Sequence, residues 1–252
     1  MGLIVDGFIS AFRNMLEKLD IDLVSIKEEG LLDDLESISS QLTTNIRDDN
    51  YENLILRCMI AYVLHELAKK KYGAPDPLYS YNYQVNLTSS KWSKVCPLMD
   101  DHSVVAICIG PYIKTWWDLV YEIAHETIHT LSPLIDPLAD YNALEEGVAV
   151  KFAEDVYAAY YSDFSPIKIP ASSPKNSYNS NNNYLTAYKA TDKLSDELLL
   201  DVRNCFSGFG RMNDFEKFNQ MVGGFLSNKE IKILFDSFKD PSNRKGMDPS
   251  IR

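Results

Sequence analysis

Cysteine is scarce in this sequence, and the few thiols are scattered. The four cysteines of the 252-residue chain stand at positions 58, 96, 108 and 205, and no two of them form a C-x-x-C pair. Disulfide frameworks and thiolate zinc sites both need cysteines at close, regular spacing. The sequence therefore favours free thiols in a reducing compartment over a disulfide-stabilised secreted domain.

Long apolar runs and basic clusters are missing too. No segment approaches the roughly 18 uninterrupted apolar residues of a membrane-spanning helix. The formal net charge is −11 and the basic residues form no stripe, which argues against nucleic acid or an anionic membrane as a partner. The first residues have no basic start, and Asp6 and Arg13 interrupt their apolar positions, unlike a signal peptide. We expect a cytoplasmic protein.

Histidine is rare as well, yet two of the four histidines stand close together. His125 and His129 enclose Glu-Thr-Ile and complete an H-E-x-x-H pattern. On a helix, residues four apart share a face, so both imidazoles can bind one metal ion. Zinc lowers the pKa of its bound water to about 7, and Glu126 stands where a carboxylate can take the proton. The pattern predicts zinc-dependent hydrolysis with Glu126 as the general base.

The surroundings of the motif decide whether it is more than chance, because H-E-x-x-H arises by accident in on the order of one chain in a hundred of this length. Residues 115–131 carry apolar side chains at helical spacing. They follow residues 103–109, a short apolar run before Gly110 that predicts a buried strand. A strand followed by a metal-binding helix is the arrangement that such a zinc hydrolase requires.

A third ligand has to come from downstream. The sixth residue after His129 is Ile135, which excludes a third histidine at that distance. Residues 142–154 predict a second helix, whose first turn carries Glu146 directly before Gly147. This Glu-Gly segment after an H-E-x-x-H helix resembles the gluzincin metallopeptidases, most closely their zinc aminopeptidase branch. The resemblance implies one Zn²⁺ per chain, held by the two histidines and Glu146.

The resemblance is confined to residues 104–160 and departs from the family in two places. Many gluzincins carry an Asp one turn after the ligand Glu, which supports a metal-bound histidine, and here that position is Val150. The hydrogen bond to the histidine must then come from another residue. The exopeptidase segment Gly-Ala-Met-Glu-Asn of the aminopeptidases is missing from this chain. Amino-terminal trimming is therefore not implied.

Two adjacent carboxylates compete for the ligand position. Glu145 and Glu146 point about 100° apart on a helix, so one cannot readily replace the other. With Asn142 as N-cap, Glu145 falls at the third helical position and predicts a capping box, which leaves Glu146 to face the metal. Gly147 beside it predicts a close approach of the two metal-binding helices. The alternatives to Glu146 as third ligand are Glu145, Asp136 and Asp140.

The resemblance also implies a residue that stabilises the oxyanion of the reaction, usually a Tyr or His from the C-terminal part of the chain. No histidine follows His129, so the role falls to a Tyr or an Arg. Tyr184 and Tyr188 stand at a suitable distance, after a polar loop, and are the residues that we expect at this position. Tyr157 and Arg211 are further alternatives.

The order of predicted elements indicates a mostly helical α+β fold with a zincin-like core and a small mixed sheet. Its regions are a helical N-terminal cap at 1–75, a core with the strands and two zinc helices at 76–161, a loop or linker at 162–183, a helical C-terminal subdomain at 184–240 and a flexible tail at 241–252. The polar loop fits a disordered linker better than a flap over the cleft.

Local signals refine this picture. Apolar stripes at 8–19 and 31–42 predict two short helices, and a third helix over 51–71 is preceded by a capping box of Asp49 and Glu52. Strict alternation over 79–87 predicts a half-buried antiparallel strand. His65 starts an imitation of the zinc motif with Lys69 at the second histidine position, and we interpret it as structural. Ser227 and Glu230 predict another capping box.

The sequence therefore favours a soluble zinc peptidase acting on a peptide or protein substrate. One alternative is a zincin-like domain that binds a peptide or protein without cutting it. Against it, a purely structural site has no need of a carboxylate at Glu126. The other alternative is a helical interaction protein in which the motif is accidental and no metal binds.

Overall fold

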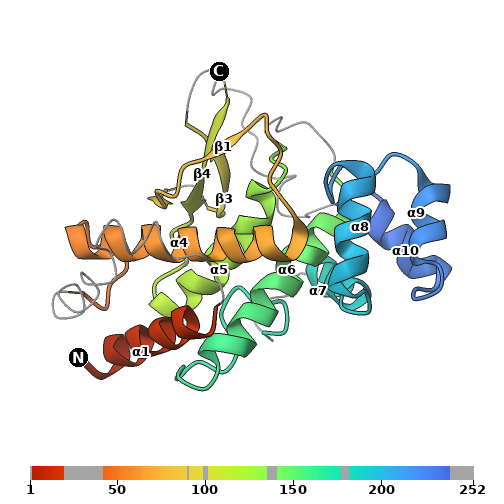
Figure 1. Cartoon of the computed structure of the whole chain (residues 1–252). Coiled ribbons are helices and arrows are strands. Elements are labelled where there is room, and N and C mark those ends of the chain that lie inside the picture. Colours follow the sequence, from red (N-terminus) through yellow and green to blue (C-terminus); the bar gives the residue numbers. More distant parts are fainter. Residues whose placement is uncertain are drawn as a thin grey trace.

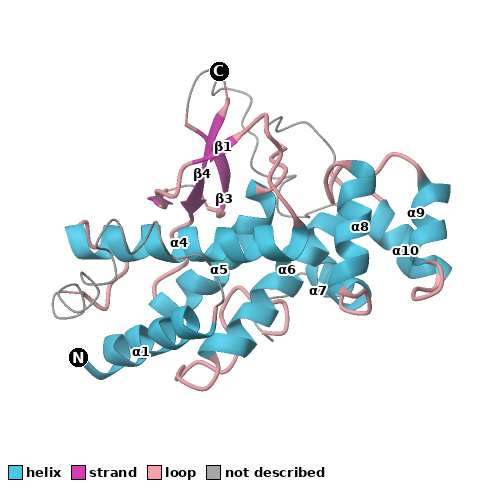
Figure 2. Cartoon of the chain, in the orientation of Figure 1, coloured by secondary structure: helices cyan, strands magenta, loops and turns pink. Residues whose placement is uncertain are grey.

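The computed structural model describes residues 2–19, 42–89, 91–98, 102–134, 141–176 and 182–238. Within these ranges the chain is a mostly helical α+β protein with one small sheet, as predicted (Figures 1 and 2). Its helical elements are α1 (Gly2–Lys18), α4 (Tyr51–Tyr72), α5 (Trp116–Thr130), α6 (Ala143–Val156), the π-helical turn η1 (Tyr157–Tyr161), α7 (Asn182–Thr191), α8 (Asp196–Phe206), α9 (Phe215–Val222) and α10 (Asn228–Phe235). None of the described helices is long and apolar enough to cross a membrane.

The sheet is built around β4 (Val104–Ile109), the buried strand predicted before the H-E-x-x-H helix. Two short segments, β1 (Ser80–Tyr81) and β2 (Asn86–Leu87), pair with it in parallel. On the other side β3 (Lys94–Pro97) pairs with it in antiparallel register, so the sheet is mixed. A strand at β3 was not expected from the sequence.

The prediction of one antiparallel strand over 79–87 is wrong in both continuity and direction. The backbone leaves the sheet after Tyr81 and returns at Asn86, and the Asn82 side chain accepts the Gln84 N–H at 2.9 Å within the gap. Burial nevertheless alternates along 79–85, as the sequence pattern required, because the odd-numbered side chains face the interior. The alternation of apolar and polar residues predicts which side chains face the interior, but it does not identify the strand with which this segment pairs.

Helix α5 lies at the centre of the molecule, between the sheet and the other helices. Thr115 begins it as N-cap, with its hydroxyl accepting the Asp118 N–H at 3.1 Å. The helix packs against α4, α6 and β4. In Figure 1 the sheet lies above α4 and α5, and α1 lies below them. The helix that carries the H-E-x-x-H motif is therefore held by neighbours on several faces at once.

Helix α4 supports α5 along its length. Its N-cap is Asn50, whose side chain accepts the Asn53 N–H at 2.9 Å, so the predicted capping box of Asp49 and Glu52 is wrong by one position. Gly73 ends the helix with φ +88°, a conformation that favours glycine. His65 is buried and its Nδ1 lies 3.0 Å from the Thr130 hydroxyl of α5, a packing role that matches the structural interpretation.

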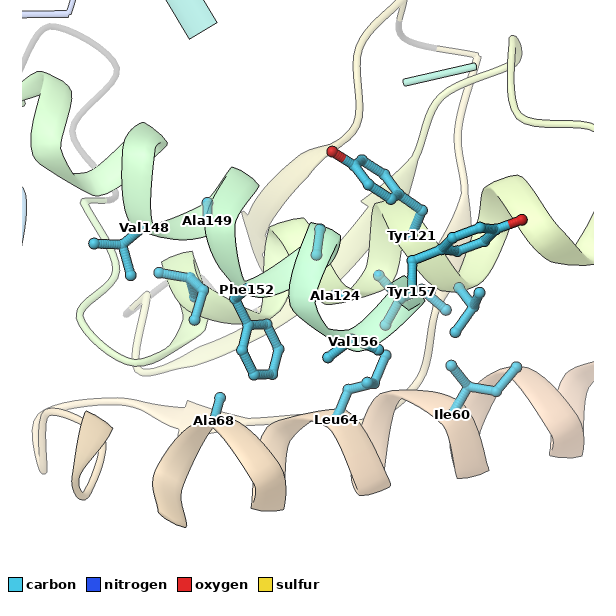
Figure 3. Packing of buried hydrophobic residues seen from close by; sticks show 14 of the residues in the cluster. Ile60, Leu64, Ala68, Tyr121, Ala124, Val148, Ala149, Phe152, Val156 and Tyr157 are labelled. Atoms are coloured by element: carbon cyan, nitrogen blue, oxygen red, sulfur yellow. The ribbon is translucent and has the colours of Figure 1, made fainter. Parts of the chain in front are cut away.

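The core is one hydrophobic cluster to which residues from α1 to α10 contribute. Figure 3 shows its centre, where Phe152 and Val156 of α6 point towards Leu64 and Ala68 of α4. The apolar stripe predicted at 8–19 is buried in this cluster as helix α1, against η1 and α5. The second stripe at 31–42 lies almost wholly outside the described residues, as does the tail at 241–252.

The polar loop after η1 is packed over its described part, residues 162–176. Ala171 donates its N–H to Asp118 of α5 at 2.8 Å, and the fully buried Ser173 donates its hydroxyl to Glu154 of α6. A disordered linker is therefore not what the structure shows over these residues. The loop brings α7 back onto α6, where the two helices pack extensively.

Candidate metal centre

His125 and His129 project from one face of α5, as the four-residue spacing requires. Their Nε2 atoms lie 3.4 Å apart, and both side chains are mostly buried. Ligand atoms at 2.0–2.1 Å from a tetrahedral zinc ion lie about 3.3 Å from one another. The separation of the two imidazole nitrogens therefore fits a shared metal ion.

Glu146 of α6 completes a group of three candidate ligands. Its Oε2 lies 3.2 Å from His125 Nε2, and its Oε1 lies 3.7 Å from His129 Nε2. One ligand atom from each of the three residues lies within 4.8 Å of the others. Within the described residues Oε2 of Glu146 is buried and accepts no aligned hydrogen bond, which is the condition of an atom left for a cation. Asp136 and Asp140 lie outside the described residues.

Tyr141 fixes the other oxygen of this carboxylate. Its hydroxyl donates a hydrogen bond to Glu146 Oε1 at 2.9 Å. The residue stands just before α6 and was not among the site residues predicted from the sequence. Only its place five residues before a candidate ligand could have drawn attention to it, and that is a weak signal.

Glu145 does not form the predicted capping box. Asn142 is the N-cap residue of α6, but its side chain makes no capping hydrogen bond. This side chain accepts the Met212 N–H and donates to the Phe235 carbonyl instead. Glu145 Oε1 accepts the hydrogen bond of His129 Nδ1 at 2.7 Å, with both side chains largely buried. Glu145 thus makes a hydrogen bond to a histidine, the kind of support that many gluzincins obtain from an Asp at the position occupied here by Val150. Its orientation towards His129 was missed because the capping pattern offered a simpler role.

Gly147 allows close approach of α6 and α7, and not of α5 and α6 as the sequence predicts. A Cβ at this position would lie 2.2 Å from Thr191 Oγ1 and 3.0 Å from the Ala187 carbonyl oxygen, both on α7. The glycine therefore allows α7, rather than α5, to approach α6. Gly210 has a similar effect on the site, because a Cβ there would lie 2.0 Å from Glu145 Oε2. Only a glycine at 210 leaves room for Glu145 to reach His129.

The electrostatics of the group favour a cation. Burial opposes a charged imidazole, but the neighbouring carboxylates outweigh it and raise the pKa of His129, chiefly through Glu146 and Glu145. The pKa of His125 is raised against the same burial effect by Glu146. Burial acts to raise the pKa of Glu146, yet the two histidines outweigh it and lower that pKa to about 2. The two histidines and Glu146 together therefore favour one or more positive charges between them, supplied by protons or by a metal ion.

Glu126 stands apart from the three candidate ligands. It is 5% exposed and does not belong to the ligand group. Burial raises its pKa to about 7, while the two histidines act in the opposite direction. A buried carboxyl group whose pKa lies near neutrality is suited to accept and release a proton.

The two tyrosines expected at the site lie in different surroundings. The ring centre of Tyr184 lies 6.1 Å from that of His125, so α7 brings this residue to the candidate centre. Tyr188 is buried with Lys175 over its ring at 4.8 Å, in a cluster around Glu154. Of the further alternatives, Tyr157 donates to Ser165 and to the Ile167 carbonyl, and Arg211 pairs with Asp76 at 2.7 Å. Tyr184 is therefore the better placed of the predicted pair.

Comparison with known proteins finds no matching family model, no matching curated protein and no matching solved structure. The chemistry of the group formed by His125, His129 and Glu146 therefore carries the functional argument.

Proposed function

We propose that this protein is a zinc-dependent peptidase of the gluzincin type, with His125, His129 and Glu146 as metal ligands and Glu126 as general base. The observation that carries the proposal is the mutual spacing of the three ligand groups, brought together from two helices. Two histidines and one glutamate form a donor set typical of catalytic zinc, which keeps a fourth position open. The residues present fit this metal, because the unbonded Glu146 Oε2 and both Nε2 atoms converge.

The chemistry divides between the metal and Glu126. Zinc, when bound, acidifies a water molecule and polarises the carbonyl of the scissile peptide bond. The Glu126 carboxylate takes the proton of that water as the oxygen adds to the carbonyl carbon. It then delivers the proton to the amide nitrogen as the C–N bond breaks, so that an acid and an amine leave. The Tyr184 hydroxyl is our candidate for donating a hydrogen bond to the oxyanion.

Substrate binding is assigned to the free edge of β3. Strand β4 is central and has no free edge, whereas β3 pairs on one side only among the described residues. The Leu98 N–H donates to the Val104 carbonyl of β4. In an antiparallel pair every second residue directs its backbone N–H and C=O to the partner strand, so those of Val95, three residues before Leu98, point away from β4. An extended peptide can pair with Val95 as an added strand. Pro97 has no N–H and limits the length of that pairing.

A peptide-library digest tests this function. The protein is purified without a metal-affinity tag and assayed with zinc, after chelation and after zinc is restored. The Glu126→Gln variant is the matched control, because it keeps the size of the side chain and all three ligands. We expect chelator-sensitive cleavage that returns with zinc and falls 10²–10⁴-fold in the variant.

The main alternative is a zincin-like domain that binds peptides without cutting them. It predicts zinc-dependent binding of library peptides by the wild-type protein and by Glu126→Gln alike, with no cleavage by either. Cleavage that survives chelation, or that is unchanged in Glu126→Gln, contradicts the proposed mechanism.

A further inference from the structure

The end of the described chain returns to the candidate metal centre. After α10, residues 236–238, here called the terminal segment, pair with residues 141–143, where α6 begins. Ala143 donates its N–H to the Asp236 carbonyl at 3.0 Å, and Phe238 donates its own to the Tyr141 carbonyl at 2.8 Å. This pairing ends three residues before Glu146. A segment more than 90 residues further along the chain therefore holds the first residues of a metal-binding helix.

Phe238 also contacts the aromatic residues that lie beside two of the three ligands. Its ring stacks on Tyr141 with centres 6.0 Å apart and an angle of 21° between the planes. It also meets the Tyr184 ring edge-on at 4.7 Å. Tyr141 donates its hydroxyl to Glu146 at 2.9 Å, and Tyr184 lies beside His125. Phe238 thus contacts the aromatic neighbours of two ligands at once.

We propose that docking of the terminal segment and metal binding are coupled, with Phe238 as a positioning residue that acts through Tyr141 on Glu146. The Tyr141 hydroxyl fixes one carboxylate oxygen of Glu146, and this leaves the other directed at the two histidines. The position of that hydroxyl depends on a ring held by the stacked Phe238 and by the backbone bond between the two residues.

The coupling is reciprocal. Whatever factor the docked segment adds to metal affinity, bound metal adds to the docking of the segment. The proposal rests on the metal centre of the proposed function but not on hydrolysis.

Zinc affinities of full-length variants, measured by competition with a chromophoric chelator, test the positioning role. Phe238→Ala and Tyr141→Phe should each lower the affinity about tenfold or more, the effect of losing outer-shell support. The double variant should lie within about twofold of Tyr141→Phe alone, because both changes act through one hydroxyl. Phe235→Leu is the matched control, since its ring packs on Phe215 and Phe218 of α9, and it should keep wild-type affinity.

Several outcomes of this measurement overturn the proposal. They are wild-type affinity in Phe238→Ala, additive losses in the double variant and an equal loss in Phe235→Leu, which would indicate a general destabilisation of the C-terminal helices. Phe238→Leu replaces the alanine variant if that one does not fold, and it should bind zinc more weakly than wild type because it loses the stacking.

Hydrogen exchange of the wild-type protein tests the reciprocal effect without any substitution. Zinc should slow exchange of the Phe238 and Ala143 amides, which bond the terminal segment to residues 141–143. Exchange rates at these amides that zinc does not change would contradict the coupling. A chain that binds no zinc overturns both the metal centre and this proposal. A chain that binds zinc, shows the coupling and cleaves no peptide loses only the peptidase function.

Discussion

Substitution of Glu145 removes the hydrogen-bond acceptor of His129 while leaving all three proposed metal ligands in place. The bond is 2.7 Å long, and Glu145 is 4% exposed, so little water is available to replace it. Substitution of a carboxylate that orients a metal-bound histidine typically lowers metal affinity 10–100-fold. Each tenfold change corresponds to about 1.4 kcal/mol, so Glu145→Ala should weaken zinc binding by about 1.4–2.8 kcal/mol.

The glutamine variant refines this expectation. Glu145→Gln keeps an oxygen that can accept the His129 Nδ1–H but loses the negative charge. Its zinc affinity should fall by about tenfold or less, between wild type and Glu145→Ala. Chelator competition measures both variants, and the thermal unfolding of the metal-free proteins checks their folding.

The sequence pattern alone led to a different expectation for the same variant. A capping glutamate at 145 predicts a stability loss of about 1 kcal/mol in Glu145→Ala and unchanged zinc affinity. Wild-type zinc affinity in Glu145→Ala, accompanied by such a stability loss, would refute the role that we assign to Glu145.

Three further predictions concern residues around the site. Gly147→Ala should destabilise the fold by about 1–3 kcal/mol because the new methyl group meets α7, and adding Thr191→Ala should recover part of the loss in urea unfolding. Burial, aided by Lys69, lowers the pKa of His65 to about 3, below that of an unfolded histidine, so acid favours the unfolded state. Between pH 7 and pH 4 the wild type should lose about 3 kcal/mol more unfolding free energy than His65→Gln; equal losses would show that His65 does not titrate in this way. Tyr184→Phe should lower kcat about 10²–10³-fold and Tyr188→Phe should not, a contrast that steady-state kinetics on a cleaved peptide would reveal or exclude.

The parts of the fold that were predictable from the sequence are those with a strong local cause. The apolar spacing of residues 115–131 and the Thr115 cap determine α5, and the apolar run before Gly110 becomes β4. The capping box at Ser227 is present as predicted. The spacing of His125 and His129 needs only a helix to bring both imidazoles to one face.

The parts that were missed depend on contacts between distant segments. Strand β3 carries no alternation and becomes a strand only because β4 offers it a partner. The sequence predicts a capping side chain at Asn142, but this side chain bonds to Met212, between α8 and α9, and to Phe235 of α10 instead. Glu145 is then available to accept the hydrogen bond of His129. Tyr141 and Phe238 stand almost 100 residues apart in the sequence and meet only through the return of the chain after α10. No local pattern encodes these pairings.

The metal content of the untagged protein tests the central claim most directly. Elemental analysis of chelator-free wild-type protein, purified without a metal-affinity tag, should find about one equivalent of zinc per chain, the full complement of a two-histidine, one-glutamate site. His129→Ala, which removes one of the three proposed ligands, should lose most of this zinc under the same conditions. Wild-type protein without zinc, or a His129→Ala variant that retains a full equivalent at similar affinity, would contradict the metal centre.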